Sequence, residues 1–393
     1  MPRNREAPKW KRLRYLVEYL VFLVVVSLGR RVSRSQLLLF GRWAGLLFFY
    51  VVASRRRIAL ANLDVAFGTT KTGKEKWTIA RESFALAVAA FCDTLPVRRP
   101  LTSAELAKLV EVSDADRALV SALLARGRGL LLVTAHFGFM ALAASSHASR
   151  DRTLHVVLRR LDNPLMEAAL SRWRSRAGLR VLYKDGGGLG IHHTLQAGGT
   201  VALAVDQSVL PKDGTVVEFF GLPVTASPSV AYFGLAGEVP ILPVFCFALP
   251  GGCCRLQYGP ELVPTRTGDP ALDRQRLTQQ CFTAFEAAIG SQPEAYLWLH
   301  KRWKYRVLSR RADWPFYARP SDETSNPRIH VLRDSRSRTQ GTSWPSGPNT
   351  TTLSIDMSVR ECYCREHDQH PARTVPQALG AIPDGSGGAA RPQ

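Results

Sequence analysis

Residues 129–138 read GLLLVTAHFG, a short apolar run that ends in a histidine. Runs of this kind recur downstream and alternate with stretches that have helical periodicity. The apolar runs are 154–159, 200–206 and 239–249, and the helical stretches are 163–178 and 189–199. Alternating short strands and helices are typical of a sheet covered by helices. The sequence therefore predicts an α/β fold with a mixed sheet.

His136 follows the first of these predicted strands directly. In α/β folds, the carboxyl edge of the sheet is where ligands bind and chemistry takes place. A neutral imidazole at that edge can take a proton from a hydroxyl group. A histidine after an apolar strand can also be a structural residue with satisfied hydrogen bonds. The residue alone does not separate these interpretations.

The first 57 residues combine strong positive charge with apolar runs. They contain 13 Lys and Arg against 2 Asp and Glu, out of a net charge of +20 for the chain. Basic clusters flank the apolar runs 15–29 and 37–54. This pattern favours helices anchored at an anionic membrane surface. A signal peptide and a buried pair of helices are the alternatives, although no small-residue cleavage site follows the first run.

The chain beyond residue 320 is rich in Ser, Thr, Pro, Gly and Arg and lacks periodicity, which is typical of a disordered tail. From Arg311 onward, 10 arginines face 9 acidic residues, so no basic arm for nucleic acid is expected. Seven scattered cysteines favour a reducing compartment, and Cys362 and Cys364 match no zinc spacing. The predicted organisation is an anchoring segment at 1–57, a catalytic domain at 58–319 and a tail at 320–393.

Five blocks stand in a recognisable order around His136. They are RRRIALANLDVAFG, HFG, LRRLDNPLMEAAL, VDQSVLPKDGTVVEFFGLPV and LWLHKRWKYR. Together they resemble the bacterial lipid A biosynthesis acyltransferases, the late acyltransferase branch of the lysophospholipid acyltransferase superfamily, over roughly residues 10–306. Their order and spacing make the resemblance specific, which an isolated HFG would not be.

The resemblance implies an enzyme at the cytoplasmic face of the bacterial inner membrane. It would move a fatty acyl chain from an acyl-thioester, carried by acyl-carrier protein or coenzyme A, to a hydroxyl of a membrane glycolipid. No metal or organic cofactor is expected. The acceptor lipid and the acyl chain length are not encoded in any of the five blocks.

The resemblance also assigns roles to particular residues. His136 would be the general base, Arg159 would bind phosphate or stabilise the oxyanion, and Asp206 and Gln207 would line the cleft. A surface salt bridge is the alternative for Arg159, and capping of a loop is the alternative for Asp206. Further substrate contacts are assigned to the acyl or acceptor pocket and to a phosphorylated headgroup; they are Phe219, Phe220, Gly221, His300 and Arg302.

Local patterns support three structural expectations. Asn163 and Pro164 predict the N-cap and the first residue of a helix. The segment AYLWL at 295–299 looks like a strand, and Trp298 and Trp303 are expected to pack rather than bind.

Ala141 departs from the family pattern. That pattern is His-x4-Asp/Glu, in which the acid would orient the imidazole, and no Asp or Glu occurs in 137–150. Three explanations stay open. Another carboxylate orients His136, with Asp206 the first candidate and Asp93 and Asp162 behind it. Alternatively His136 acts unassisted, or the protein is an inactive homologue that binds lipid or a partner enzyme.

Overall fold

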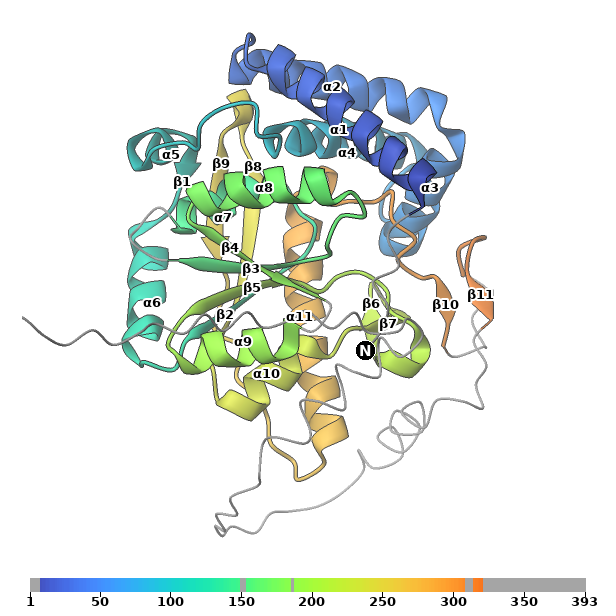
Figure 1. Ribbon diagram of the computed structural model, residues 1–393. Coiled ribbons are helices and arrows are strands. Elements are labelled where there is room, and N and C mark those ends of the chain that lie inside the picture. The colour runs from blue at the N-terminus through green and yellow to red at the C-terminus, as the bar shows by residue number, and fades with distance from the viewer. Residues whose placement is uncertain (1–7, 149–152, 185–186, 308–313, 321–393) are drawn as a thin grey trace, which may run out of the picture.

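A computed structural model describes residues 8–148, 153–184, 187–307 and 314–320 (Figure 1). Helices and strands alternate through most of this range, as the sequence predicts. The helices are α1 (Lys9–Gly29), α2 (Arg34–Val51), α3 (Ala53–Phe67), α4 (Gly73–Asp93), α5 (Ser103–Leu109), α6 (Asp114–Ala125), α7 (Met140–Ala148), α8 (Pro164–Arg176), α9 (Gly187–Gln196), α10 (Ser229–Gly237) and α11 (Pro270–Ser291). The predicted tail, apart from Pro320, and the Cys362 and Cys364 pair lie outside the described residues.

The central sheet is mixed and has seven strands in the order β1-β9-β8-β2-β5-β3-β4. Its strands are β1 (Val110–Glu111), β2 (Leu130–Thr134), β3 (Leu154–Leu158), β4 (Leu179–Tyr183), β5 (Thr200–Ala204), β8 (Ile241–Ala248) and β9 (Cys254–Tyr258). The run from β8 to β4 is parallel, and β9 pairs antiparallel with β8. The predicted mixed sheet is confirmed.

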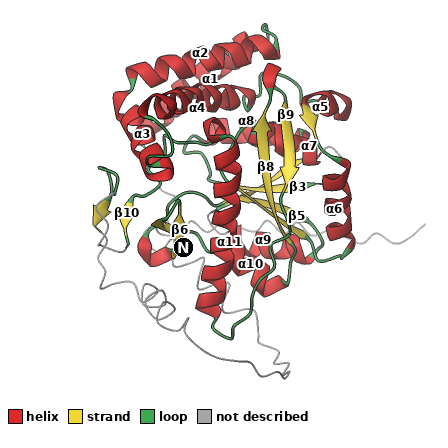
Figure 2. Ribbon diagram, turned by 180° about the vertical axis from the view of Figure 1, so that it is seen from behind, coloured by secondary structure: helices red, strands yellow, loops and turns green. Residues whose placement is uncertain are grey.

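Helices cover both faces of this sheet. α7 and α8 lie on the face toward the viewer in Figure 1. α11 crosses the opposite face, which is toward the viewer in Figure 2. Two small sheets stand apart from the main one. They are the hairpin β6 (Thr215–Phe219) with β7 (Leu222–Ala226), and the short pair β10 (Tyr305–Arg306) with β11 (Arg319–Pro320).

The N-terminal helices stack on the body through α4. At Gly41 and Gly45 of α2, an added Cβ would press on the backbone of Ala89 and of Phe84 in α4, so these glycines permit the close approach. Among the described residues, no single helix is long and apolar enough to cross a membrane, although α2 and α3 together reach that length across a 91° bend. The predicted boundary at residues 57 and 58 falls inside α3.

Two of the three local structural expectations agree with the structure, and one does not. Asn163 caps α8, since its Oδ1 accepts from the amides of Leu165 and Met166, and Pro164 is the first helical residue. Trp298 and Trp303 are fully buried. The strand expected at 295–299 is wrong. This segment forms turns, and within it Tyr296 makes an isolated bridge to Phe137. No strand forms because the backbone of the segment bonds to α3, α4 and the His136 loop.

Candidate active site

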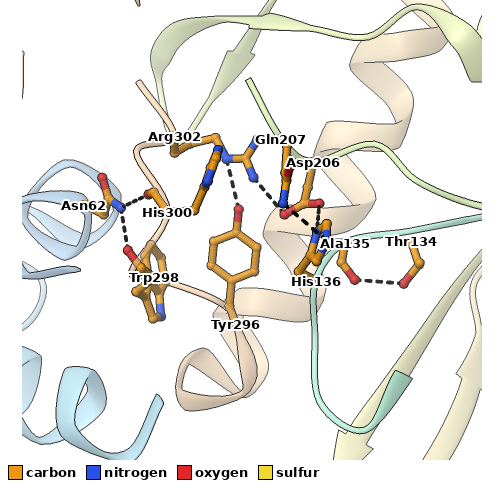
Figure 3. A network of polar contacts seen from close by, with 10 residues as sticks. All are labelled: Asn62, Thr134, Ala135, His136, Asp206, Gln207, Tyr296, Trp298, His300 and Arg302. Carbon is orange, nitrogen blue, oxygen red and sulfur yellow. Dashed lines mark hydrogen bonds and ion pairs between the residues drawn. The ribbon is translucent and has the colours of Figure 1, made fainter. Parts of the chain in front are cut away.

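His136 and Asp206 meet because the register of two neighbouring strands brings them together. β2 and β5 are parallel, and Thr134 lies opposite Ala204 at their carboxyl ends. His136 and Asp206 each lie two residues beyond the ends of these strands. His136 Nδ1 is consequently 2.6 Å from Asp206 Oδ1 (Figure 3).

Arg302 completes the network behind Asp206. Its Nη2 donates to Asp206 Oδ2 over 2.7 Å, and its Nε donates to the hydroxyl of Tyr296 over 3.0 Å. The side chains of Asp206 and Arg302 are each 2% exposed, whereas that of His136 is 31% exposed. The result is a buried chain of polar contacts with the imidazole at its accessible end.

The charges of this network set the protonation states. Burial alone lowers the pKa of His136, but the charge and the hydrogen bond of Asp206 outweigh it, and the pKa lies above the ordinary 6.5. Burial alone raises the pKa of Asp206, but the charges of His136 and Arg302 outweigh it, and the pKa lies below the ordinary 3.8. Asp206 is therefore ionised at neutral pH and accepts from Nδ1–H.

When the imidazole is neutral, the other ring nitrogen of His136 keeps its lone pair. Its neighbour is Gln207, whose Nε2 lies 3.3 Å from His136 Nε2 and can donate to it. This arrangement follows from the tautomer that the Asp206 contact requires. In this state Nε2 can accept a proton from a hydroxyl group.

The backbone around His136 is fixed by the turn segment 295–300. The amide of Leu297 donates to His136 O over 3.1 Å, and the amide of Gly138 donates to Ala295 O over 2.9 Å. Gly138 has φ of +61°, and an added Cβ would overlap the carbonyl oxygen of Cys246. Only glycine satisfies both requirements without strain.

Two polar residues of the N-terminal helices hold that turn segment. Asn62 of α3 donates from Nδ2 to the carbonyls of Trp298 and His300, each over 2.7 Å. Ser83 of α4 donates to Tyr296 O over 2.6 Å. The sequence patterns did not predict Asn62, Ser83 or Tyr296 as part of the site. The only signal for any of them was the position of Asn62 in the block RRRIALANLDVAFG.

A largely apolar cavity of about 340 Å³ adjoins His136. It lies between the sheet and the helices α7 and α8, and its wall includes Ala141. The remaining lining is mostly aliphatic and aromatic, with His147 and Tyr258 among the few polar groups; it includes Leu132, Leu154, Val156, Leu179, Val244, Phe245, Leu256 and Trp173. Such a space suits a hydrocarbon chain whose polar end reaches the imidazole.

Two residues expected at a headgroup lie in the interior instead. Arg302 is buried against Asp206, because the carboxylate needs a cation as its partner away from water. His300 is half-buried, and burial together with the nearby Arg302 lowers its pKa to about 4. A neutral His300 and a buried Arg302 do not form the exposed cationic contact expected from the sequence.

The segment 219–221 also lies apart from the cavity. Phe219 is fully buried, with its ring against Phe282 and Trp303. Phe220 and Gly221 both have positive φ and form the two-residue turn of the β6–β7 hairpin. None of the three lines the cavity beside His136, in contrast to the pocket-shaping role expected from the resemblance.

The remaining candidates are separate from the network. Arg159 is 81% exposed on its side chain and lies 3.8 Å from the exposed Asp162. Asp93 forms a two-point ion pair with Arg34. Neither Asp162 nor Asp93 therefore supports His136. Within the described ranges, no three His, Cys, Asp or Glu side chains gather as a metal site would require.

A family model supplies the decisive comparison. The model of the bacterial lipid A biosynthesis acyltransferases matches residues 5–305, and this range includes every residue of the His136 network. The chain belongs to this family. It is also similar to the lipid A biosynthesis lauroyltransferase of Escherichia coli (strain K12), with 27% identity over 194 residues. That match covers 46% of this chain and 58% of the relative's length.

Proposed function

We propose that the protein is a membrane-attached O-acyltransferase. It moves a fatty acyl chain from an acyl-thioester of acyl-carrier protein or coenzyme A to a hydroxyl of a glycolipid such as a lipid A precursor. Family membership supports the reaction class. The observation that carries the proposal is the imidazole of His136, which is supported by Asp206 and borders the apolar cavity.

The geometry suits general base catalysis. His136 Nε2 accepts the proton of the acceptor hydroxyl as its oxygen attacks the thioester carbonyl. The C–S bond then breaks, and the imidazolium returns the proton to the departing thiolate. Asp206 holds Nδ1–H and stabilises the imidazolium, as the buried carboxylate does in hydrolase triads. Arg302 keeps Asp206 ionised throughout.

Ala141 acquires a role of its own in this proposal. The carboxylate that the family pattern places at this position is supplied here from the end of β5 by Asp206. Position 141 forms part of the cavity wall, so an apolar side chain there suits the acyl chain better than a charge would. The loss of the acid at 141 is therefore compatible with activity.

We place the protein at the cytoplasmic face of the inner membrane, and the N-terminal helices support attachment to a membrane surface. α1 and α2 expose a large apolar surface, and basic residues flank both helices. Apolar area together with nearby arginines favours an anionic membrane interface. The exposed side chains include Leu16, Val17, Leu20, Val21, Val24, Leu28, Leu39, Phe40, Trp43, Leu47 and Val51.

Transfer by membranes that contain the full chain tests the proposal. Acyl-carrier protein loaded with a labelled acyl chain, and coenzyme A loaded with the same chain, would be supplied in separate reactions with a lipid A precursor. We expect transfer from one donor, and its loss in His136→Ala. His193→Ala, which removes an exposed histidine of α9, is the matched control. Undiminished transfer in His136→Ala would overturn the mechanism, and no transfer by the wild type would favour the inactive, lipid-binding homologue.

A further inference from the structure

A second, larger cavity lies away from His136. It is a groove of about 1060 Å³ between the second half of α1, residues 96–101, α5 and α8. α1 and α8 lie next to each other in Figure 1, and α5 lies near the end of α8. The groove shares only Trp173 with the lining of the cavity beside His136. It is therefore a separate feature of the molecule.

The charge of this basic groove is one-sided. Seven Lys and Arg line it, against Glu105 as the acidic residue. Arg34 is neutralised by Asp93 and Arg99 by Glu105. The other five form no ion pair within the described part of the chain; they are Arg30, Arg98, Lys108, Arg172 and Arg176.

Two buried donors of Arg98 are not satisfied by the described residues of the groove. Its Nε and Nη2 are shielded from solvent, and neither has a hydrogen-bond partner among the described residues. Its carbonyl is fixed by the indole N–H of Trp173 over 3.0 Å. Buried guanidinium donors without acceptors are costly, and a phosphate satisfies two of them at once.

The floor of the groove is apolar. Phe22, Val26 and Val97 are buried there in one cluster. Leu23 lines the groove and is 41% exposed, next to the apolar face of α1 that points outward. A ligand that fits both parts carries an anionic head and hydrocarbon chains.

We propose that the basic groove binds an anionic phospholipid, with the phosphate at Arg98 and Arg172 and the acyl chains along α1. This inference rests on the proposed membrane attachment and adds a discrete headgroup site to it. The bound lipid would fix the orientation of α1 and α8 at the membrane surface. It is not the reacting lipid, since the groove contains no part of the His136 network.

Vesicle flotation of the full chain tests the site. Phosphatidylcholine vesicles would be compared with vesicles that also contain phosphatidylglycerol, for the wild type and for Arg98→Gln with Arg172→Gln. The control is Arg180→Gln with Arg276→Gln, which removes the same charge from exposed positions outside the groove. We expect the groove variant to bind the anionic vesicles about thirtyfold more weakly.

Binding to phosphatidylcholine alone should be equal in all three proteins, because it depends on the apolar faces of α1 and α2. An equal loss in both variants on anionic vesicles would overturn the site, since binding would then follow total charge. If the wild type bound no vesicles at all, membrane attachment itself would fail. Acyl transfer in detergent should persist in the groove variant, which separates this proposal from the His136 mechanism.

Competition identifies the occupant. Soluble dihexanoyl phosphatidylglycerol should displace the protein from anionic vesicles in the wild type and not in the groove variant. Inorganic phosphate at the same ionic strength should displace it far less. Equal displacement by inorganic phosphate would mean a free-phosphate site, and displacement by acyl-carrier protein would mean a protein-docking surface; either result overturns the phospholipid assignment.

Discussion

Asp206 supplies to His136 the carboxylate that position 141 lacks. The two side chains are 70 residues apart in the chain and 2.6 Å apart in the fold. An acid five residues after the histidine would come from the following helix, whereas Asp206 comes from the end of the neighbouring strand. The network as a whole gives several measurable consequences.

Asp206→Asn should lower kcat by up to about 10⁴-fold, as in serine proteases where the equivalent acid is replaced. The amide can hold the wrong tautomer of His136 and cannot stabilise the imidazolium. Steady-state transfer kinetics measure this. Asp162→Asn, which changes an exposed carboxylate outside the network, should have wild-type kinetics. Wild-type turnover in Asp206→Asn would show that His136 works unassisted.

The pH profile should report the raised pKa of His136. The base acts when neutral, so kcat/KM should rise with pH through an inflection above 6.5. In Asp206→Asn the inflection should move to lower pH, because the carboxylate that raises the pKa is gone. An inflection at the same pH in both proteins would assign it to another group.

The same shifts predict how stability depends on pH. The pKa of His136 is higher in the folded state than in the unfolded state. Its contribution to the free energy of unfolding is therefore full below about pH 6.5 and is lost as pH rises through the folded-state pKa. The pKa of Asp206 is lower in the folded state than in the unfolded state. Its contribution to the free energy of unfolding is therefore present above about pH 3.8 and is lost as pH falls toward the folded-state pKa. Chemical denaturation of the wild type and Asp206→Asn across this range measures both.

Arg302→Met should destabilise the fold by about 3–5 kcal/mol, because it leaves the buried Asp206 carboxylate without its cation. Arg302→Lys keeps the charge but cannot reach Asp206 and Tyr296 together, so an intermediate loss is expected. Denaturant unfolding with activity measured in parallel checks both. Arg159→Gln is the exposed control and should unfold like the wild type. Similar stability of all three variants would contradict a buried ion pair.

Gly138→Ala should be strongly destabilising. The left-handed backbone costs about 1–3 kcal/mol for a residue with a side chain, and the methyl group would also overlap the carbonyl of Cys246. Gly73→Ala is the matched control, since an added Cβ there meets no atom within 4 Å and the residue starts α4. Thermal unfolding compares the two variants. Equal melting temperatures would show that the His136 loop adapts easily.

Ala141→Glu should reduce transfer rather than restore it. The carboxylate would enter an apolar cavity beside a histidine that already has an acid partner. The glutamine in Ala141→Gln has nearly the same size as the glutamate but carries no charge. In the same assay it distinguishes the effect of side-chain size from the effect of charge. Activity above the wild type in Ala141→Glu would mean that His136 lacks adequate support from Asp206.

Much of the fold follows from local pattern. Short apolar runs predicted β2, β3, β5 and β8, and Asn163 with Pro164 predicted the start of α8, since these features depend on neighbours in the chain. The strand expected at 295–299 was wrong for the opposite reason. Its amides and carbonyls bond to residues that lie far away in sequence, including Asn62 and Ser83.

The candidate site also contains some features that local sequence pattern predicts and others that it does not. His136 and Asp206 were predictable because each follows a strand, and parallel neighbours bring their carboxyl ends to one edge. The burial of Arg302 was not predictable, because a run of Lys and Arg usually indicates a solvated surface. Whether such a cation turns inward depends on a buried carboxylate from another element, here Asp206.

The pairing of Thr134 with Ala204 makes the active imidazole a property of assembled tertiary structure. A slip of one residue between β2 and β5 would turn Asp206 to the other side of the strand and remove the carboxylate that raises the pKa of His136. A newly made chain therefore lacks the contact between His136 and Asp206 until these two strands have paired.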